Sequence, residues 1–66
     1  MLSTAIRSFD YRPDARELDI LFKTGRSYVY HDVPPEAVKG FRSAFSKGRY
    51  FNARIRDRYR FTERRR

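Results

Sequence analysis

Residues 17–31 have the pattern of a β-hairpin, and this pattern determines the fold class. Apolar and charged residues alternate over residues 17–22, and two tyrosines alternate with their neighbours over residues 27–31. Such alternation is typical of strands that bury one face. Gly25 ends the polar loop between the two segments, where a tight reversal needs a residue that tolerates positive φ. The sequence therefore predicts two antiparallel strands.

The length of this loop decides which face the two tyrosines occupy. A two-residue loop places Tyr28 and Tyr30 on the polar face, where they could stack on unpaired bases. A three-residue loop with Gly25 in the left-handed conformation places Tyr28 opposite Ile20 and Tyr30 opposite Leu18, in the core. We favour the core interpretation, because a chain of 66 residues with few aliphatic side chains needs aromatic rings in its core. Base stacking by both tyrosines is the alternative.

The other segments complete a small α+β domain. Residues 6–11 are rich in β-forming residues and break strict alternation once, which predicts a bulged strand and a three-stranded antiparallel meander. Two C-terminal helices are expected to cover the sheet, one from the prolines at 34–35 to about Phe45 and one after Ser46. The apolar stripe of the first helix consists of Ala37, Val38, Phe41, Ala44 and Phe45. Residues 59–62 alternate like a short extended segment.

Basic residues are concentrated at the C-terminal end of the chain. Residues 1–46 carry seven Lys or Arg and six Asp or Glu, whereas residues 47–66 carry nine and two. We expect a single domain over residues 1–63 and a disordered basic tail over residues 64–66. A positive field confined to one segment attracts polyanions, and nucleic acid is the first candidate.

The candidate nucleic-acid-binding residues lie in the second helix and the segment after it. Each Lys or Arg that meets a phosphate releases a condensed counterion, and a guanidinium can bind two phosphate oxygens at once. If about six such side chains engaged a single strand, log affinity would fall against log salt with a slope of roughly −4. The candidates are Lys47, Arg49, Tyr50, Asn52, Arg54, Arg56, Arg58 and Arg60.

Two of these candidates have a second interpretation. Tyr50 projects beside Arg54 and either stacks on a base or packs at the edge of the helix. Asn52 either contacts nucleic acid or makes a local hydrogen bond. The motif Ser46-Lys47-Gly48 lacks the glycine spacing of a phosphate-binding loop, so we interpret it as a helix break in which Ser46 caps the second helix.

Two motifs carry a resemblance to a known family. The first is Leu18-x-Ile20-x-Phe22-x-x-Gly25-x-x-Tyr28-x-Tyr30-x-x-Val33-Pro34, and the second is Ser46-Lys47-Gly48-Arg49-Tyr50-Phe51-Asn52-x-x-Ile55-Arg56-x-x-Tyr59. Together they resemble the KTSC domain over about residues 3–61, here in a stand-alone form. The family takes its name from the C-terminus of some bacterial lysyl-tRNA synthetases, and that context implies RNA binding. The arginines after Phe61 lie beyond the family pattern, so their role is inferred from charge alone.

Other classes of function have little support in the sequence. The chain has no cysteine, which excludes thiol catalysis and disulfides and fits a cytoplasmic location. His31 is the only histidine, and no acidic cluster has the spacing of metal ligands, so we expect no enzyme, no metal and no cofactor. No segment is long and apolar enough to span a membrane. The expected partner is RNA in preference to DNA, with an acidic protein or a weak homodimer as the alternative.

Overall fold

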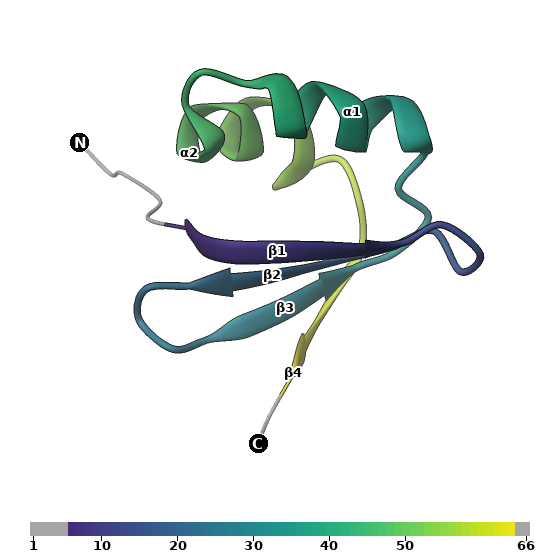
Figure 1. Cartoon of the computed structure of the whole chain (residues 1–66). Helices are drawn as coiled ribbons and strands as arrows, with labels where there is room; N and C mark the ends of the chain where they lie inside the picture. The colour runs from purple at the N-terminus through teal and green to yellow at the C-terminus, as the bar shows by residue number, and fades with distance from the viewer. Residues whose placement is uncertain (1–5, 65–66) are drawn as a thin grey trace.

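The computed structural model describes residues 6–64 and shows an antiparallel sheet with helices packed on one face (Figure 1). Within these residues the sheet has four strands in the order β1-β2-β3-β4. The strands are β1 (Ile6–Arg12), β2 (Glu17–Phe22), β3 (Ser27–Tyr30) and β4 (Phe61–Arg64). The helical elements are α1 (Pro35–Ser43), α2 (Lys47–Tyr50) and the π-helix η1 (Phe51–Ile55).

The α+β class and the N-terminal meander are confirmed, but the sheet has four strands rather than three. β2 has the predicted bounds, and the pairing of β1 with β2 shifts register between Ile6 and Ser8, as a bulge requires. The predicted extended segment near the C-terminus is a paired strand, with Phe61 opposite Tyr30. This pairing joins residues 31 positions apart, and local sequence patterns carry no signal for it. Arg64, expected in the disordered tail, is the last residue of β4; residues 65 and 66 lie outside the described part of the chain.

The β2–β3 hairpin has the three-residue loop. Gly25 has a φ of 97° and donates its N–H to the carbonyl of Phe22 at 2.9 Å. The resulting register pairs Ile20 with Tyr28 and Leu18 with Tyr30, so both tyrosines share the face that the helices cover. The core interpretation of this pair is therefore the correct one.

Helix α1 begins where the prolines predict but ends before the predicted residue. Its apolar stripe is buried at Val38 and Phe41. Ala44 already has an extended backbone, with φ −65° and ψ 137°, so the chain leaves the helix before it reaches Phe45. The prediction that Phe45 continues the buried stripe is wrong, since its side chain is fully exposed.

The second helix begins as predicted and then widens. Ser46 caps it, because its hydroxyl accepts the backbone N–H of Arg49 at 3.3 Å. From Phe51 the helix has π geometry, and the N–H of Arg56 donates to the carbonyl of Phe51 at 2.8 Å. Phe51 and Ile55 are both buried against the sheet, whereas a regular α-helix had been expected over this segment.

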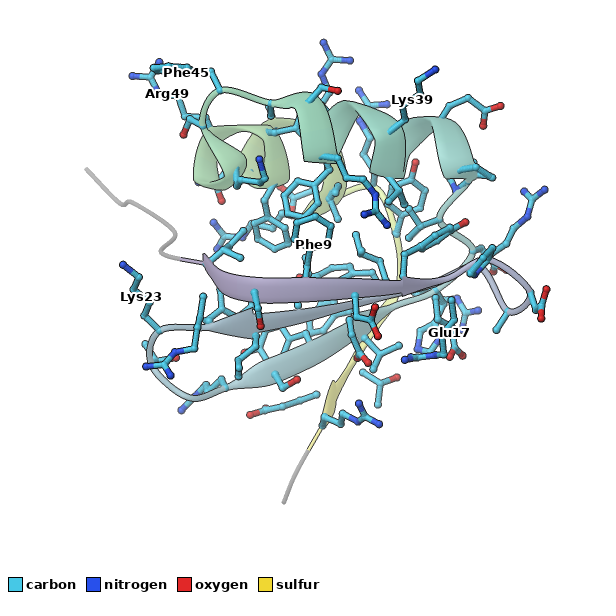
Figure 2. All side chains as sticks on the ribbon, viewed as in Figure 1. Phe9, Glu17, Lys23, Lys39, Phe45 and Arg49 are labelled. Carbon is cyan, nitrogen blue, oxygen red and sulfur yellow. The ribbon has the colours of Figure 1, made fainter. Side chains whose placement is uncertain are left out.

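Aromatic rings supply much of the core between the sheet and the helices. Phe9 points from β1 toward the helices (Figure 2), and its ring centroid lies 4.5 Å from that of Phe41. The rings of Tyr30 and Phe51 meet edge to face at 5.4 Å. The buried residues are Leu18, Ile20, Tyr30, Val33, Val38, Phe41, Phe51 and Ile55. This core fixes α2 and η1 on the sheet and so positions the basic side chains that they carry.

Candidate functional site

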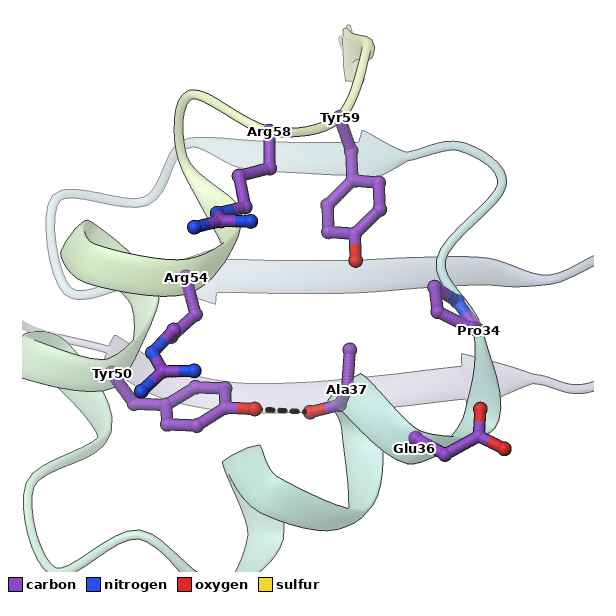
Figure 3. A pocket seen from close by; sticks show the side chains of 7 residues that line it. All are labelled: Pro34, Glu36, Ala37, Tyr50, Arg54, Arg58 and Tyr59. Carbon is purple, nitrogen blue, oxygen red and sulfur yellow. Dashed lines mark hydrogen bonds between the residues drawn. The ribbon is translucent and has the colours of Figure 1, made fainter.

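Two adjoining hollows border α2 and η1, one beside the start of α1 and one beside the turn that follows α1. The tyrosine hollow has a volume of about 310 Å³ and is shown in Figure 3. It is lined by Pro34, Glu36, Ala37, Tyr50, Arg54, Arg58 and Tyr59. The phenylalanine hollow has a volume of about 330 Å³. It is lined by Ala44, Phe45, Ser46, Arg49, Tyr50, Ala53 and Arg54.

The two hollows share Tyr50 and Arg54 and therefore form one continuous surface. Three of the predicted arginines lie along it: Arg49, Arg54 and Arg58. We call these three residues the arginine track. All three side chains are exposed, so the structure brings half of the predicted basic set to one surface.

The guanidinium groups of the arginine track have no carboxylate partner among residues 6–64. The arginine–carboxylate ion pairs within this part of the chain use other arginines, namely Arg12, Arg60 and Arg64. The only acidic residue that lines either hollow is Glu36, in the tyrosine hollow. The track therefore keeps its charge available for an external anion.

The other predicted basic residues do not join the track. The Lys47 ammonium donates to the carbonyl oxygens of Arg42 and Ala44 at 3.1 and 3.2 Å, which makes it part of the connection between α1 and α2. Arg60 lies 3.4 Å from the carboxylate of Asp32. Arg56 is exposed but lines neither hollow. The structure thus brings only part of the predicted basic set together on one surface.

Tyr50 packs between the helices. Its hydroxyl donates to the carbonyl oxygen of Ala37 at 3.0 Å, as Figure 3 shows, and its ring lies 5.9 Å from that of Phe41. Tyr50 therefore packs at the edge of the helix, and its hydroxyl is already bonded within the domain. Its half-buried ring nevertheless lines both hollows. Asn52 is half-buried on η1 and lines neither hollow.

The two hairpin tyrosines do not form a stacking platform. Tyr30 is 2% exposed, and burial, together with the nearby Tyr28, raises its pKa to about 12. Tyr28 is half-buried, and its ring stacks on Phe61 with centroids 5.3 Å apart. Base stacking by Tyr30 is thus excluded by burial, and one face of Tyr28 is already occupied.

The sheet face opposite the helices carries a network of paired charges. Glu17 points away from the helices in Figure 2 and accepts from the Arg12 guanidinium at 3.1 Å. Asp19 accepts from Arg12 at 2.8 Å and from Arg64 at 3.0 Å, and its hydrogen bond is the main reason that the pKa of Arg12 is raised. Because all these charges are paired within the domain, this face is a weaker candidate for anion binding than the arginine track.

His31 belongs to the same network. Its Nε2 lies 2.9 Å from the Thr62 hydroxyl, and its Nδ1 lies 3.6 Å from the Glu17 carboxylate. Within residues 6–64 no three His, Cys, Asp or Glu residues are grouped as a metal site would require. In the same range, no helix is both long and apolar enough to cross a membrane.

Comparison with known proteins assigns the chain to a family. The sequence profile of the KTSC domain matches residues 2–59. The crystal structure of a KTSC domain protein from Yersinia pestis superimposes with a TM-score of 0.87 at 38% sequence identity, covering 98% of this chain and 92% of that one.

Two relatives identified by sequence differ in size. An uncharacterized protein of Stutzerimonas stutzeri (strain A1501) is 42% identical over 50 residues, which cover 76% of this chain and 70% of the relative. A lysine–tRNA ligase of Nostoc punctiforme is 33% identical over 60 residues, which cover 91% of this chain but 11% of that enzyme. The similarity therefore concerns one small domain of the ligase.

Proposed function

This chain belongs to the KTSC domain family, and on that premise we propose that it is a small, non-enzymatic module that binds nucleic acid, RNA in preference to DNA. The observation that carries the proposal is the arginine track, in which three exposed guanidinium groups without carboxylate partners among residues 6–64 line two adjoining hollows. The occurrence of a related domain in a lysine–tRNA ligase supports RNA as the ligand.

The proposed mechanism is neutralisation of backbone phosphates. Arg49, Arg54 and Arg58 each present a planar guanidinium that can donate two parallel hydrogen bonds to phosphate oxygens. Every contact releases a counterion from the nucleic acid, so binding gains free energy most strongly at low salt. Contacts of this kind hold the strand in place and do not distinguish one base from another.

Salt dependence tests this mechanism quantitatively. With three arginines engaged, log affinity for a single strand should fall against log salt with a slope of about −2, because each contact contributes about −0.7. This value replaces the slope expected for six residues, since Lys47 and Arg60 make contacts within the domain and Arg56 lines neither hollow. Fluorescence anisotropy of a labelled RNA strand at several salt concentrations measures the slope.

A matched pair of double variants separates the track from net charge. Arg54→Gln with Arg58→Gln should reduce the slope to about −0.7 and weaken binding at low salt. Arg7→Gln with Lys23→Gln removes the same charge from exposed positions on β1 and the hairpin loop, away from both hollows. This control should leave the slope unchanged. Equal weakening by the two double variants, or no binding by the unaltered protein at low salt, would contradict the proposal.

A second candidate function is homodimerisation through an edge of the sheet. β4 is a short edge strand whose residues are all exposed, and Phe61 on it leaves 53% of its surface uncovered. Unpaired backbone groups on such an edge can pair with a second chain. Analytical ultracentrifugation at high salt distinguishes the two functions, because strand pairing persists there whereas phosphate binding is screened.

A further inference from the structure

Phe45 is exposed on an ordered turn, in a domain that otherwise buries or half-buries most of its aromatic rings. Its side chain is 106% exposed relative to the reference state. Leaving such a ring in water forgoes the free energy that burial of an aromatic side chain gives. This is a large cost for a chain this short.

The backbone around Phe45 is held in place by contacts on both sides. On one side, the Lys47 ammonium donates to the carbonyl oxygen of Ala44 at 3.2 Å. On the other side, the Ser46 hydroxyl accepts the N–H of Arg49 at 3.3 Å. Both flanking residues have extended backbones, with ψ near 137° at Ala44 and 110° at Ser46. The ring is therefore displayed from a fixed position, which lowers the entropic cost of binding to it.

The surroundings of the ring combine apolar surface with positive charge. Phe45 forms one side of the phenylalanine hollow, where Ala44 and Ala53 supply small apolar groups and Arg49 and Arg54 supply cations. Phe45 and Arg49 lie next to each other at the end of the helical layer in Figure 2. No acidic side chain lines this hollow. A ligand that suits it has a flat apolar face and an attached anion.

We infer that Phe45 stacks on an unpaired base of a single-stranded nucleic acid whose phosphates follow the arginine track. This inference rests on the proposed function and specifies the ligand: a strand with accessible bases, because bases in a duplex are stacked on each other and cannot cover the ring. An apolar protein segment fits less well, since it would bury Arg49 and Arg54 without an anionic partner.

Strands with and without bases provide the test. Three ligands are compared at low salt, with affinity expressed per phosphate: an RNA single strand of about 12 nucleotides, an abasic strand of the same length, and the matching duplex, which should bind no more tightly per phosphate than the abasic strand. The unaltered protein should bind the base-bearing strand about tenfold more tightly than the abasic strand. Phe45→Ala should make the two affinities equal. It should do so by weakening binding to the base-bearing strand, while the affinity for the abasic strand and its salt slope stay unchanged.

A tryptophan variant gives a direct signal for stacking. The chain contains no tryptophan, so Phe45→Trp places a single indole at the site. Its fluorescence should be quenched by the base-bearing strand and not by the abasic strand. Phe61→Ala removes the other exposed large apolar ring, on β4, and should leave the affinity ratio unchanged.

The possible failures have different meanings. If Phe45→Ala leaves the ratio of affinities unchanged, or weakens binding to both strands equally, the stacking inference is wrong. The proposed binding of phosphates by the arginine track would not be affected by that result. If the unaltered protein binds none of the three ligands, the proposed function fails and the inference fails with it. If Phe45→Ala instead abolishes self-association that nucleic acid does not affect, the ring serves a second copy of the chain, and the inference is overturned.

Discussion

The ring of Tyr50 lies directly against Gly40 of α1. A methyl group added to Gly40 would fall 2.9 Å from Cζ of Tyr50 and closer still to its hydroxyl oxygen. That hydroxyl donates to the carbonyl of Ala37 at 3.0 Å, and the ring also packs beside Phe41. The close approach of α1 and α2, and with it the floor of both hollows, thus depends on the missing side chain at position 40.

Gly40→Ala should therefore destabilise the domain by about 1 kcal/mol. In an open helix the change would stabilise by about 1 kcal/mol, but here the added methyl group overpacks the contact with Tyr50 at a cost of about 2 kcal/mol. In a Tyr50→Ala background the overpacking disappears, and the same change should stabilise by up to about 1 kcal/mol. Urea unfolding of the four proteins measures the reversal, and the same sign in both backgrounds would contradict the contact.

Local patterns predicted the hairpin in detail because both its determinants are local. The alternation over residues 17–22 fixes which side chains face the core, and Gly25 fixes the loop length. The same reasoning predicted an extended segment near the C-terminus but not its pairing with β3, because that pairing depends on contacts between Phe61 and two tyrosines far along the chain. No local pattern in the sequence indicates that Tyr28 and Phe61 are in contact.

The candidate site was predicted only in part, because the direction in which each arginine points depends on how the second helix ends. The helix widens into π geometry from Phe51, and it ends after Ile55. Beyond that point Arg56 lines neither hollow and Arg60 pairs with Asp32, whereas Arg58 lines the tyrosine hollow beside Arg54. The exposure of Phe45 was missed for a related reason, since periodicity continues through the end of α1 although the helix does not.

Asp19 connects strands that are not neighbours. Its carboxylate accepts from Arg12 on β1 and from Arg64 on β4, and its side chain is 15% exposed. Asp19→Asn should lower the free energy of unfolding by about 1 kcal/mol, because the acceptor of both hydrogen bonds loses its negative charge. The loss is no larger because both guanidinium groups are partly exposed to water. The loss should shrink at 1 M salt, where screening is strong.

Asp14→Asn is the matched control for this change. Asp14 is exposed in the β1–β2 turn, and no ion pair is found for it within residues 6–64. Asp14→Asn should change the free energy of unfolding by no more than about 0.5 kcal/mol. Thermal or urea unfolding at two salt concentrations compares the variants, and equal effects of the two substitutions would argue against a linking role for Asp19.

Tyr30 should make the domain sensitive to alkali. Burial raises its pKa to about 12, whereas an unfolded tyrosine titrates near 10. Below pH 10 the phenol is neutral in both states, and its stabilising contribution is complete. As pH rises from 10 toward 12, the unfolded chain loses the proton first, so the free energy of unfolding should fall by up to about 2 kcal/mol.

Tyr30→Phe should remove this loss of stability between pH 10 and pH 12. The variant keeps the ring that packs on Phe51 and Phe61, so its stability at pH 7 should remain close to that of the unaltered protein. The measurement is the difference in urea-unfolding free energy between the two proteins at pH 9 and at pH 11.5. Other tyrosines and lysines titrate in both proteins and cancel in this difference. A constant difference would mean that the hydroxyl of Tyr30 ionises normally.

Substitution of Phe41 should destabilise the domain and substitution of Phe45 should not, although periodicity places both residues on one stripe. Phe41 is fully buried and lies 4.5 Å from the ring of Phe9, so Phe41→Leu should cost about 1 kcal/mol or more. Phe45 touches no core residue through its exposed ring, so Phe45→Ala should change the free energy of unfolding by less than about 0.5 kcal/mol. Urea unfolding checks both values. A loss of several kcal/mol for Phe45→Ala would contradict this prediction, because it would mean that the ring packs against the domain in solution.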